Sequence, residues 1–131
     1  MAVLLNHQLT GEQKENACKD LNIDEFVLMP KEIADIWSNS DPSDCSVLAY
    51  IKKVIGWLEE STSLGDYVIV QGDYGLTFAV VDWCLDNGRK AVYATTERIA
   101  KESRDENIIK VQREFRFVRF REYQRPEKLR K

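Results

Sequence analysis

The sequence of 131 residues predicts an α/β fold, a mostly parallel sheet flanked by helices with a C-terminal β-hairpin. Over the first two thirds, short apolar runs alternate with segments whose apolar residues recur at helical spacing. That alternation is typical of a parallel sheet with right-handed helical crossovers. In the last third, two extended segments flank a polar turn, which predicts the hairpin. The length fits one domain covering residues 1–131.

Apolar runs bounded by polar or turn residues mark the strands, and amphipathic stretches mark the helices. The predicted parallel strands are Ala2–Leu5, Asp24–Met29, Tyr67–Val70 and Lys90–Ala94. The predicted helices cover residues 11–21, 30–37, 47–60 and 76–87. Thr10 opens a T-G-E-Q capping box, Pro30 suits a first helical turn, and Gly88 ends the last helix.

The last third is expected to extend the sheet. Residues 98–101 and 108–120 have extended character and are separated by the polar stretch S-R-D-E-N. In the second segment, four apolar residues share one parity and two take the other: Ile109, Val111, Phe115 and Phe117, then Val118 and Phe120. Because side chains alternate between the faces of a strand, this switch predicts a bulge or bend near Phe117.

The composition, 44% apolar and 31% charged, is that of a soluble globular protein. No apolar run is long enough to cross a bilayer, and the N-terminus lacks the basic start of a secretory signal. We therefore expect a cytoplasmic protein. The three cysteines are scattered and histidine occurs once, so no metal site is expected. Cys18 and Cys84 fall on predicted helices, and we expect both to face the core.

Charge is unevenly distributed along the chain. The net charge is −3, yet residues 113–131 contain eight lysines and arginines and three glutamates, a net charge of +5. The rest of the chain therefore carries −8. A basic end on an acidic body can meet an anionic ligand or a nucleic acid, or it can simply be solvated.

The stretch Y-V-I-V-Q-G-D-Y-G, residues 67–75, is the centre of the predicted fold. It predicts a buried strand, a tight glycine turn and the start of a helix. A helix N-terminus at the carboxyl end of a parallel strand offers free N–H groups to a phosphate. In the alternative interpretation, Gly72 only makes the turn and Asp73 only caps the helix. The motif is neither a dinucleotide fingerprint nor a Walker A loop.

Polar residues follow three of the predicted strands. They are Asn6 and His7, then Gln71, Gly72, Asp73 and Tyr74, then Thr95, Thr96 and Arg98. In a parallel sheet these ends share one edge, so we expect the side chains to converge there. The sole histidine, His7, is either part of such a site or a solvent-exposed structural residue. Arg98 can alternatively be an ordinary surface arginine that pairs with Glu97 or Glu102.

Four pieces of the sequence carry a resemblance to a known family: L-L-N-H-Q-L-T, G-D-Y-V-I-V-Q-G-D-Y-G, V-Y-A-T-T-E-R and F-R-F-V-R-F-R-E-Y. They resemble the small stand-alone Csx-type ring nucleases of type III CRISPR systems, whose Rossmann-like fold is related to CARF domains. The resemblance implies cleavage of a cyclic oligoadenylate messenger, most favourably cyclic tetra-adenylate, which switches off antiviral signalling. It also implies a homodimer that works without a metal. We expect no cofactor, no membrane partner and no requirement for a long nucleic acid.

The roles of individual residues are our own inference from the chemistry of the reaction, not a part of the resemblance. In these enzymes a ribose 2′-OH attacks the neighbouring phosphate and leaves a 2′,3′-cyclic phosphate. We expect His7 to act as general acid or base, Arg98 to neutralise developing charge, and Asp73 to bind a ribose hydroxyl or orient the imidazole. The expected ligand-binding residues are Asn6, Gln71, Gly72, Tyr74, Gly75, Thr95 and Thr96, with Tyr74 stacking on a base.

Two other functions are compatible with the same residues. A sensor or sponge would bind the cyclic nucleotide and leave it intact. An RNA-binding or partner-regulating module would depend most on the basic C-terminal segment. A Rossmann dehydrogenase is not expected, because no G-x-G-x-x-G follows a predicted strand.

Overall fold

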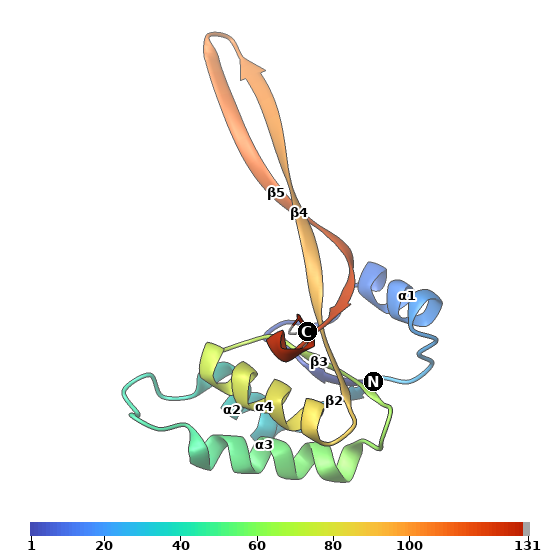
Figure 1. Ribbon diagram of the computed structural model, residues 1–131. Coiled ribbons are helices and arrows are strands. Elements are labelled where there is room, and N and C mark those ends of the chain that lie inside the picture. The colour runs from blue at the N-terminus through green and yellow to red at the C-terminus, as the bar shows by residue number, and fades with distance from the viewer. Residues whose placement is uncertain (130–131) are drawn as a thin grey trace.

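The computed structural model describes residues 1–129, with side chains at all of these positions except 105, 113, 128 and 129 (Figure 1). The fold is α/β, with a five-stranded mixed sheet in the order β2-β1-β3-β4-β5. The strands are β1 Ala2–Leu4, β2 Val27–Leu28, β3 Tyr67–Val70, β4 Lys90–Asp105 and β5 Ile108–Glu122. The helices are α1 Gly11–Asp20, α2 Lys31–Asn39, α3 Leu48–Ser61, α4 Tyr74–Asp86 and the short 3-10 helix η1 Pro126–Leu129.

The sheet is parallel across its first four strands, as predicted. β1 pairs in parallel with β2 on one side and β3 on the other, and β3 pairs in parallel with β4. The antiparallel β5 then completes the predicted hairpin. Val68, Ile69 and Val70 of β3 are fully buried, which explains why this strand is apolar at successive positions rather than alternating.

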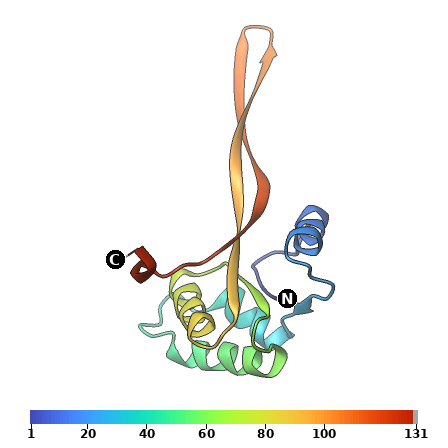
Figure 2. The same cartoon turned by 45° about the vertical axis from the view of Figure 1, so that its right-hand side comes forward.

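Helices cover both faces of the sheet, again as predicted (Figure 2). Leu4 and Val70 point to the face covered by α2, α3 and α4, where they pack with Val54 and Val80. The neighbouring residues of the same strands point to the other face, where α1 contributes Ala17. The period of two along each strand therefore divides the core into two layers.

The N-terminus of α1 has the predicted capping box. Thr10 Oγ1 accepts a hydrogen bond from the Gln13 backbone N–H at 3.1 Å, and the Gln13 side-chain oxygen accepts one from the Thr10 N–H at 3.0 Å. The prediction that Cys18 faces the core is wrong, because its side chain is exposed. Gln13 and Ala17, four residues apart, form the inward stripe of α1, and Cys18 lies about 100° around the helix from Ala17.

Cys84 is buried, as predicted, and burial raises the pKa of its thiol to about 12. Thiolates, not thiols, react with disulfide reagents. We therefore expect a thiol titration of the native protein near pH 8 to count two cysteines, the exposed Cys18 and Cys45, and the denatured protein to count three. A native count of three would contradict the buried position of Cys84.

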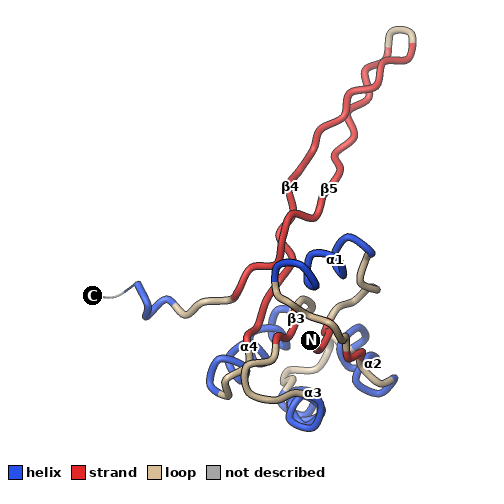
Figure 3. Tube along the Cα trace, turned by 90° about the vertical axis from the view of Figure 1, so that its right-hand side faces the viewer, coloured by secondary structure: helices blue, strands red, loops and turns tan. Residues whose placement is uncertain are grey.

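The strands β4 and β5 continue beyond the sheet as a long two-stranded ribbon. β4 pairs with β3 through the Ile69–Val92 pair, whereas its pairing with β5 runs on to the Asp105–Ile108 pair. We call residues 96–117 the arm, and it projects away from the helices (Figures 1 and 3). The predicted end of the strand at Ala94 is therefore wrong. The predicted sheet strand and the predicted first strand of the hairpin are one continuous strand, because the polar residues that follow Ala94 pair with β5 without interruption of the ladder.

The base of the arm contains the predicted bulge. Thr95 lies opposite Arg119 and Thr96 lies opposite Phe117, so Val118 is an extra residue on β5. This irregularity explains why the apolar residues change parity there, and it confirms the prediction of a bulge near Phe117. It also bends the ribbon where it leaves the sheet.

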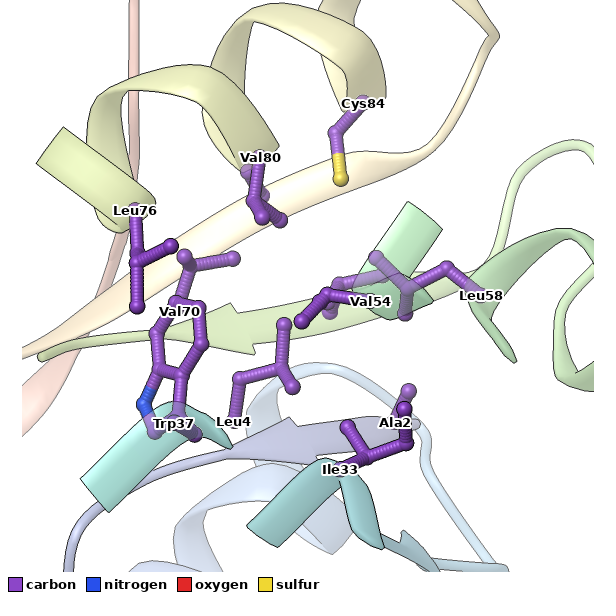
Figure 4. Packing of buried hydrophobic residues seen from close by; sticks show 12 residues of the cluster. Ala2, Leu4, Ile33, Trp37, Val54, Leu58, Val70, Leu76, Val80 and Cys84 are labelled. Atoms are coloured by element: carbon purple, nitrogen blue, oxygen red, sulfur yellow. The ribbon is translucent and has the colours of Figure 1, made fainter. Parts of the chain in front are cut away.

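Trp37 of α2 is the largest fully buried side chain. Its indole lies in the core beside Val70 and Leu4 (Figure 4). The indole Nε1–H donates to the backbone oxygen of Gln71 at 3.0 Å, so the only polar atom of the ring is satisfied. This contact fixes α2 against the turn that follows β3.

Candidate ligand site at the carboxyl edge of the sheet

An open cleft of about 830 Å³ lies beyond the carboxyl ends of β1 and β2. Asn6, His7 and Gln8 line it directly after β1, and α1 contributes Lys14. The remaining walls are mostly apolar and come from the core and from the β2–α2 region: Val3, Leu5, Leu9, Phe26, Leu28, Met29, Ala34 and Ser38. The cleft therefore combines amides, an imidazole and an ammonium group with apolar surface, at the edge where parallel sheets bind ligands.

His7 is exposed on this cleft. Its Nδ1 lies 2.9 Å from the backbone oxygen of Gln8. A carbonyl oxygen can only accept, so Nδ1 carries the proton in this contact. In the neutral ring Nε2 is then the basic nitrogen, which is the form that a general base requires.

Asn6 and Lys14 complete the polar part of the cleft. Asn6 Oδ1 accepts a weak hydrogen bond from Ser38 Oγ at 3.4 Å, which leaves the amide NH₂ out of that bond. Lys14 was not among the predicted site residues, so its place in the cleft was missed. The signal that could have found it is its position one turn after the Thr10 cap, next to the loop that carries His7.

Gln71 and Gly72 have structural roles in the turn after β3. The Gln71 side-chain oxygen accepts a hydrogen bond from the Ala94 N–H at 2.9 Å and thereby joins the end of β3 to β4. A Cβ on Gly72 would lie 2.7 Å from Trp37 Nε1, closer than real Cβ contacts. Gly72 is therefore required for the packing of the indole, whatever else the turn binds.

Asp73 caps α4, as the alternative interpretation held. Its Oδ2 accepts a hydrogen bond from the Leu76 N–H at 3.1 Å, which satisfies one of the free donors at the start of the helix. Gly75 lies beside this carboxylate, since an added Cβ would stand 3.4 Å from Oδ2. Tyr74 is 95% exposed and thus accessible to a stacking partner.

The predicted convergence of three strand ends is only partly present. Of the three sets, Asn6 and His7 line the cleft, and Gln71 reaches β4 at Ala94. Thr95, Thr96 and Arg98 do not follow a strand end, because β4 runs through them. Thr95 Oγ1 donates to the Arg119 backbone oxygen at 2.8 Å across the bulge, and Arg98 lies on the arm with its guanidinium 5.4 Å from the Phe115 ring centre.

The C-terminal segment after the arm is attached to the body. Tyr123 Oη donates to the backbone oxygen of Val70 at 2.6 Å, and burial raises the pKa of this phenol. Arg125 forms ion pairs with Asp82 at 2.9 Å and with Asp86 at 2.8 Å on α4. A truncation at Arg121 would therefore remove core contacts as well as charge, and charge-reversing substitutions are the cleaner test of the basic segment.

Neither a metal site nor a membrane-spanning helix is found among the residues that the structure describes. Among these residues, no three His, Cys, Asp or Glu side chains are grouped so that they could hold a metal ion. Within the same range, none of the helices has the length and apolar character needed to cross a membrane.

The fold and the cleft define an α/β protein whose parallel strands end at an open ligand-sized site and whose sheet extends into a two-stranded arm. The chain belongs to the family described as "Uncharacterized protein MJ1673 family", which matches residues 1–121. A protein described as "Uncharacterized protein MJ1673" from Methanocaldococcus jannaschii is 38% identical over 123 residues, which is 94% of this chain and 95% of that protein. No solved structure matches the chain significantly.

Proposed function

We propose that this protein is a metal-independent ring nuclease that cleaves a cyclic oligoadenylate, most favourably cyclic tetra-adenylate, in the cytoplasm. In this proposal the α/β sheet is Rossmann-like and CARF-related, and cleavage ends type III CRISPR signalling. The observation that carries the proposal is the position of His7, which lines an open cleft together with amide, ammonium and apolar groups and uses Nδ1, not Nε2, to contact the Gln8 backbone oxygen. The resemblance of the Q-G-D-Y-G and Y-A-T-T-E-R pieces to ring nucleases supports the choice of substrate.

The reaction needs few protein groups. The ribose 2′-oxygen forms a bond to the adjacent phosphorus, its proton passes to Nε2 of His7, and the bond from phosphorus to the 5′-oxygen breaks. The departing 5′-oxygen takes a proton from water or from the Lys14 ammonium, which also balances phosphate charge. Asn6 and Gln8 can bind an adenine edge, while Phe26 offers a face to the base.

The openness of the cleft suits a cyclic substrate. A volume of about 830 Å³ is within the range of small-ligand sites, so one nucleotide and its phosphodiester fit inside. The rest of the ring can remain outside the cleft or contact a second copy. In this proposal Arg98 supplies its positive charge from the arm rather than from the edge of the sheet. Asp73 contributes mainly by capping α4.

The test is incubation of the purified protein with cyclic tetra-adenylate in EDTA, followed by chromatography of the products. Linear adenylates that end in 2′,3′-cyclic phosphate are expected. Ring that is bound in proportion to protein and stays intact would replace the nuclease with the sensor or sponge. Absence of both binding and cleavage would overturn the proposal altogether.

A further inference from the structure

Three arginines form a row along β5 where the arm joins the body (Figures 1 and 3). They are Arg116, Arg119 and Arg121, and we call them the basic row. Their partners across the ladder on β4 are, in the same order, Glu97, Thr95 and Tyr93. Alternate residues of a strand share a face, and so do directly opposite residues. All three arginines therefore lie on one face of the ribbon, despite the bulge between the first two.

The basic row is exposed, and its charge is not used within the chain. All three side chains are exposed. Among the side chains that the structure describes, none forms a salt bridge with the row. Arg125, by contrast, is held by two aspartates of α4. The only carboxylate directly opposite the row is Glu97, so the three arginines and this glutamate carry a net charge of +2.

Arg121 is supported by aromatic rings rather than by an acid. Its Nη1 donates to Tyr93 Oη at 3.2 Å, and its guanidinium lies 5.7 Å from the centre of the Tyr93 ring. That ring packs in turn on Tyr123, with the ring centres 4.8 Å apart. Because the support is neutral, it positions the guanidinium and leaves its positive charge uncompensated. The other N–H donors of the guanidinium remain for a ligand.

A second open cleft, of about 470 Å³, lies beside the row. It is lined by Arg119 and Arg121, by Gln124 and by apolar side chains that include Phe120. Glu122 also lines it, so two arginines face one carboxylate there. The volume is within the range of small-ligand sites, so one nucleotide fits. None of the three arginines lines the larger cleft of about 830 Å³, and the two sites are therefore separate.

We propose that the basic row binds the phosphate backbone of a single-stranded nucleic acid, with one nucleoside entering the adjoining cleft. Two residues of a strand span about 6.7 Å, so Arg119 and Arg121 can reach successive phosphates of an extended chain. Guanidinium planes and aromatic rings also stack on bases. A membrane surface would require a broad basic and apolar face, whereas this row is one strand wide. The inference does not rest on the ring-nuclease proposal, because the row shares no residue with the cleft that holds His7.

Fluorescence anisotropy with a labelled single-stranded DNA of about 16 nucleotides tests this on the full-length chain. DNA offers the same phosphates but has no 2′-OH, so the proposed ring cleavage cannot act on the probe and the two proposals fail independently. We expect a dissociation constant of about 1–100 µM at physiological salt. Three phosphate contacts predict a slope of about −2 for the logarithm of affinity against that of salt, which is about 16-fold weaker binding between about 50 and 200 mM.

Substitutions within the row should lower both the affinity and the salt dependence. A double variant, Arg119→Gln with Arg121→Gln, should bind at least about tenfold more weakly, with a slope of about −0.7. Arg104→Gln is the matched control, because it removes the same charge from the arm but lies opposite Ile109 on the other face of the ribbon. Its affinity and slope should match those of the wild type.

Glu97→Gln should strengthen binding, by about two- to fivefold, because it removes the carboxylate opposite Arg116. A gain in affinity cannot arise from a loss of folded protein. This variant therefore tests the charge of the face independently of the arginine substitutions.

Three results would overturn the proposal. The first is a wild type that shows no saturable binding of the DNA at about 50 mM salt. The second is binding that the double variant weakens no more than Arg104→Gln does, which would place the nucleic acid elsewhere on the chain. The third is sedimentation of the wild type, but not of the double variant, with phosphatidylglycerol vesicles in the absence of any DNA binding, which would assign the row to a membrane surface.

Discussion

Trp37→Ala is expected to lower the free energy of unfolding by about 3–5 kcal/mol, the range for truncating a buried tryptophan. The indole is 1% exposed, so its loss leaves a cavity between α2 and the sheet. It also removes the hydrogen bond to the Gln71 backbone oxygen. Because a whole domain is stable by only about 5–15 kcal/mol, this variant should be partly unfolded at moderate temperature. Urea unfolding followed by circular dichroism measures the effect.

Two smaller changes test the hydrogen bond of this indole and its close packing against Gly72. Trp37→Phe keeps most of the apolar ring but leaves the Gln71 oxygen without the indole donor, a cost of about 1–3 kcal/mol. Gly72→Ala puts a methyl group 2.7 Å from Nε1 and should cost about 1–3 kcal/mol through overpacking.

The double variant of Trp37→Phe and Gly72→Ala should be more stable than the sum of the two effects predicts. The smaller ring makes room for the added methyl group, so the two changes are coupled. Trp57→Phe is the control for the replacement of an indole by a phenyl ring, because Trp57 is only partly buried at the margin of the core. If the effects of the two variants on the free energy of unfolding are strictly additive, the indole is not the reason that glycine is required at position 72.

The elements that the sequence predicts well are those set by neighbouring residues. The capping box of Thr10 and Gln13 is a contact over three residues, and the three successive buried residues of β3 form an apolar run that is visible in the sequence. The bulge at Val118 was predictable for the same reason, because a change of parity is visible within a single strand. Such signals need no knowledge of which strand pairs with which.

The length of β4 was not predictable in that way. Residues 95–105 are mostly polar and lack the apolar alternation of a half-buried strand, and they are extended because they pair with β5. The error carried into the site, since Thr95 and Arg98 were assigned to a strand end that does not exist. Lys14 was missed although its position one turn after the Thr10 cap is a local signal, whereas Phe26 reaches the cleft from the segment before β2, which only the three-dimensional arrangement reveals.

His7→Ala is expected to lower the rate of ring cleavage by at least about a hundredfold, since positioned general acid–base groups are usually worth a factor of roughly 100 to 10,000. The imidazole is exposed, so the free energy of unfolding should change little. Product formation from cyclic tetra-adenylate at saturating substrate gives the rate, and circular dichroism checks the fold. A loss of less than about tenfold would show that His7 is not the general acid or base.

His7→Gln separates proton transfer from ligand binding. Glutamine keeps hydrogen-bonding capacity at this position but cannot take a proton at neutral pH, so kcat should fall nearly as far as in His7→Ala while KM changes little. Added imidazole should restore part of the activity of His7→Ala, because the truncated side chain leaves space in a cleft of about 830 Å³ that opens to solvent. His7→Gln fills that space and should gain less. Equal activity of His7→Gln and the wild type would mean that the imidazole only binds the ring, and the base would then have to be sought elsewhere on the cleft wall.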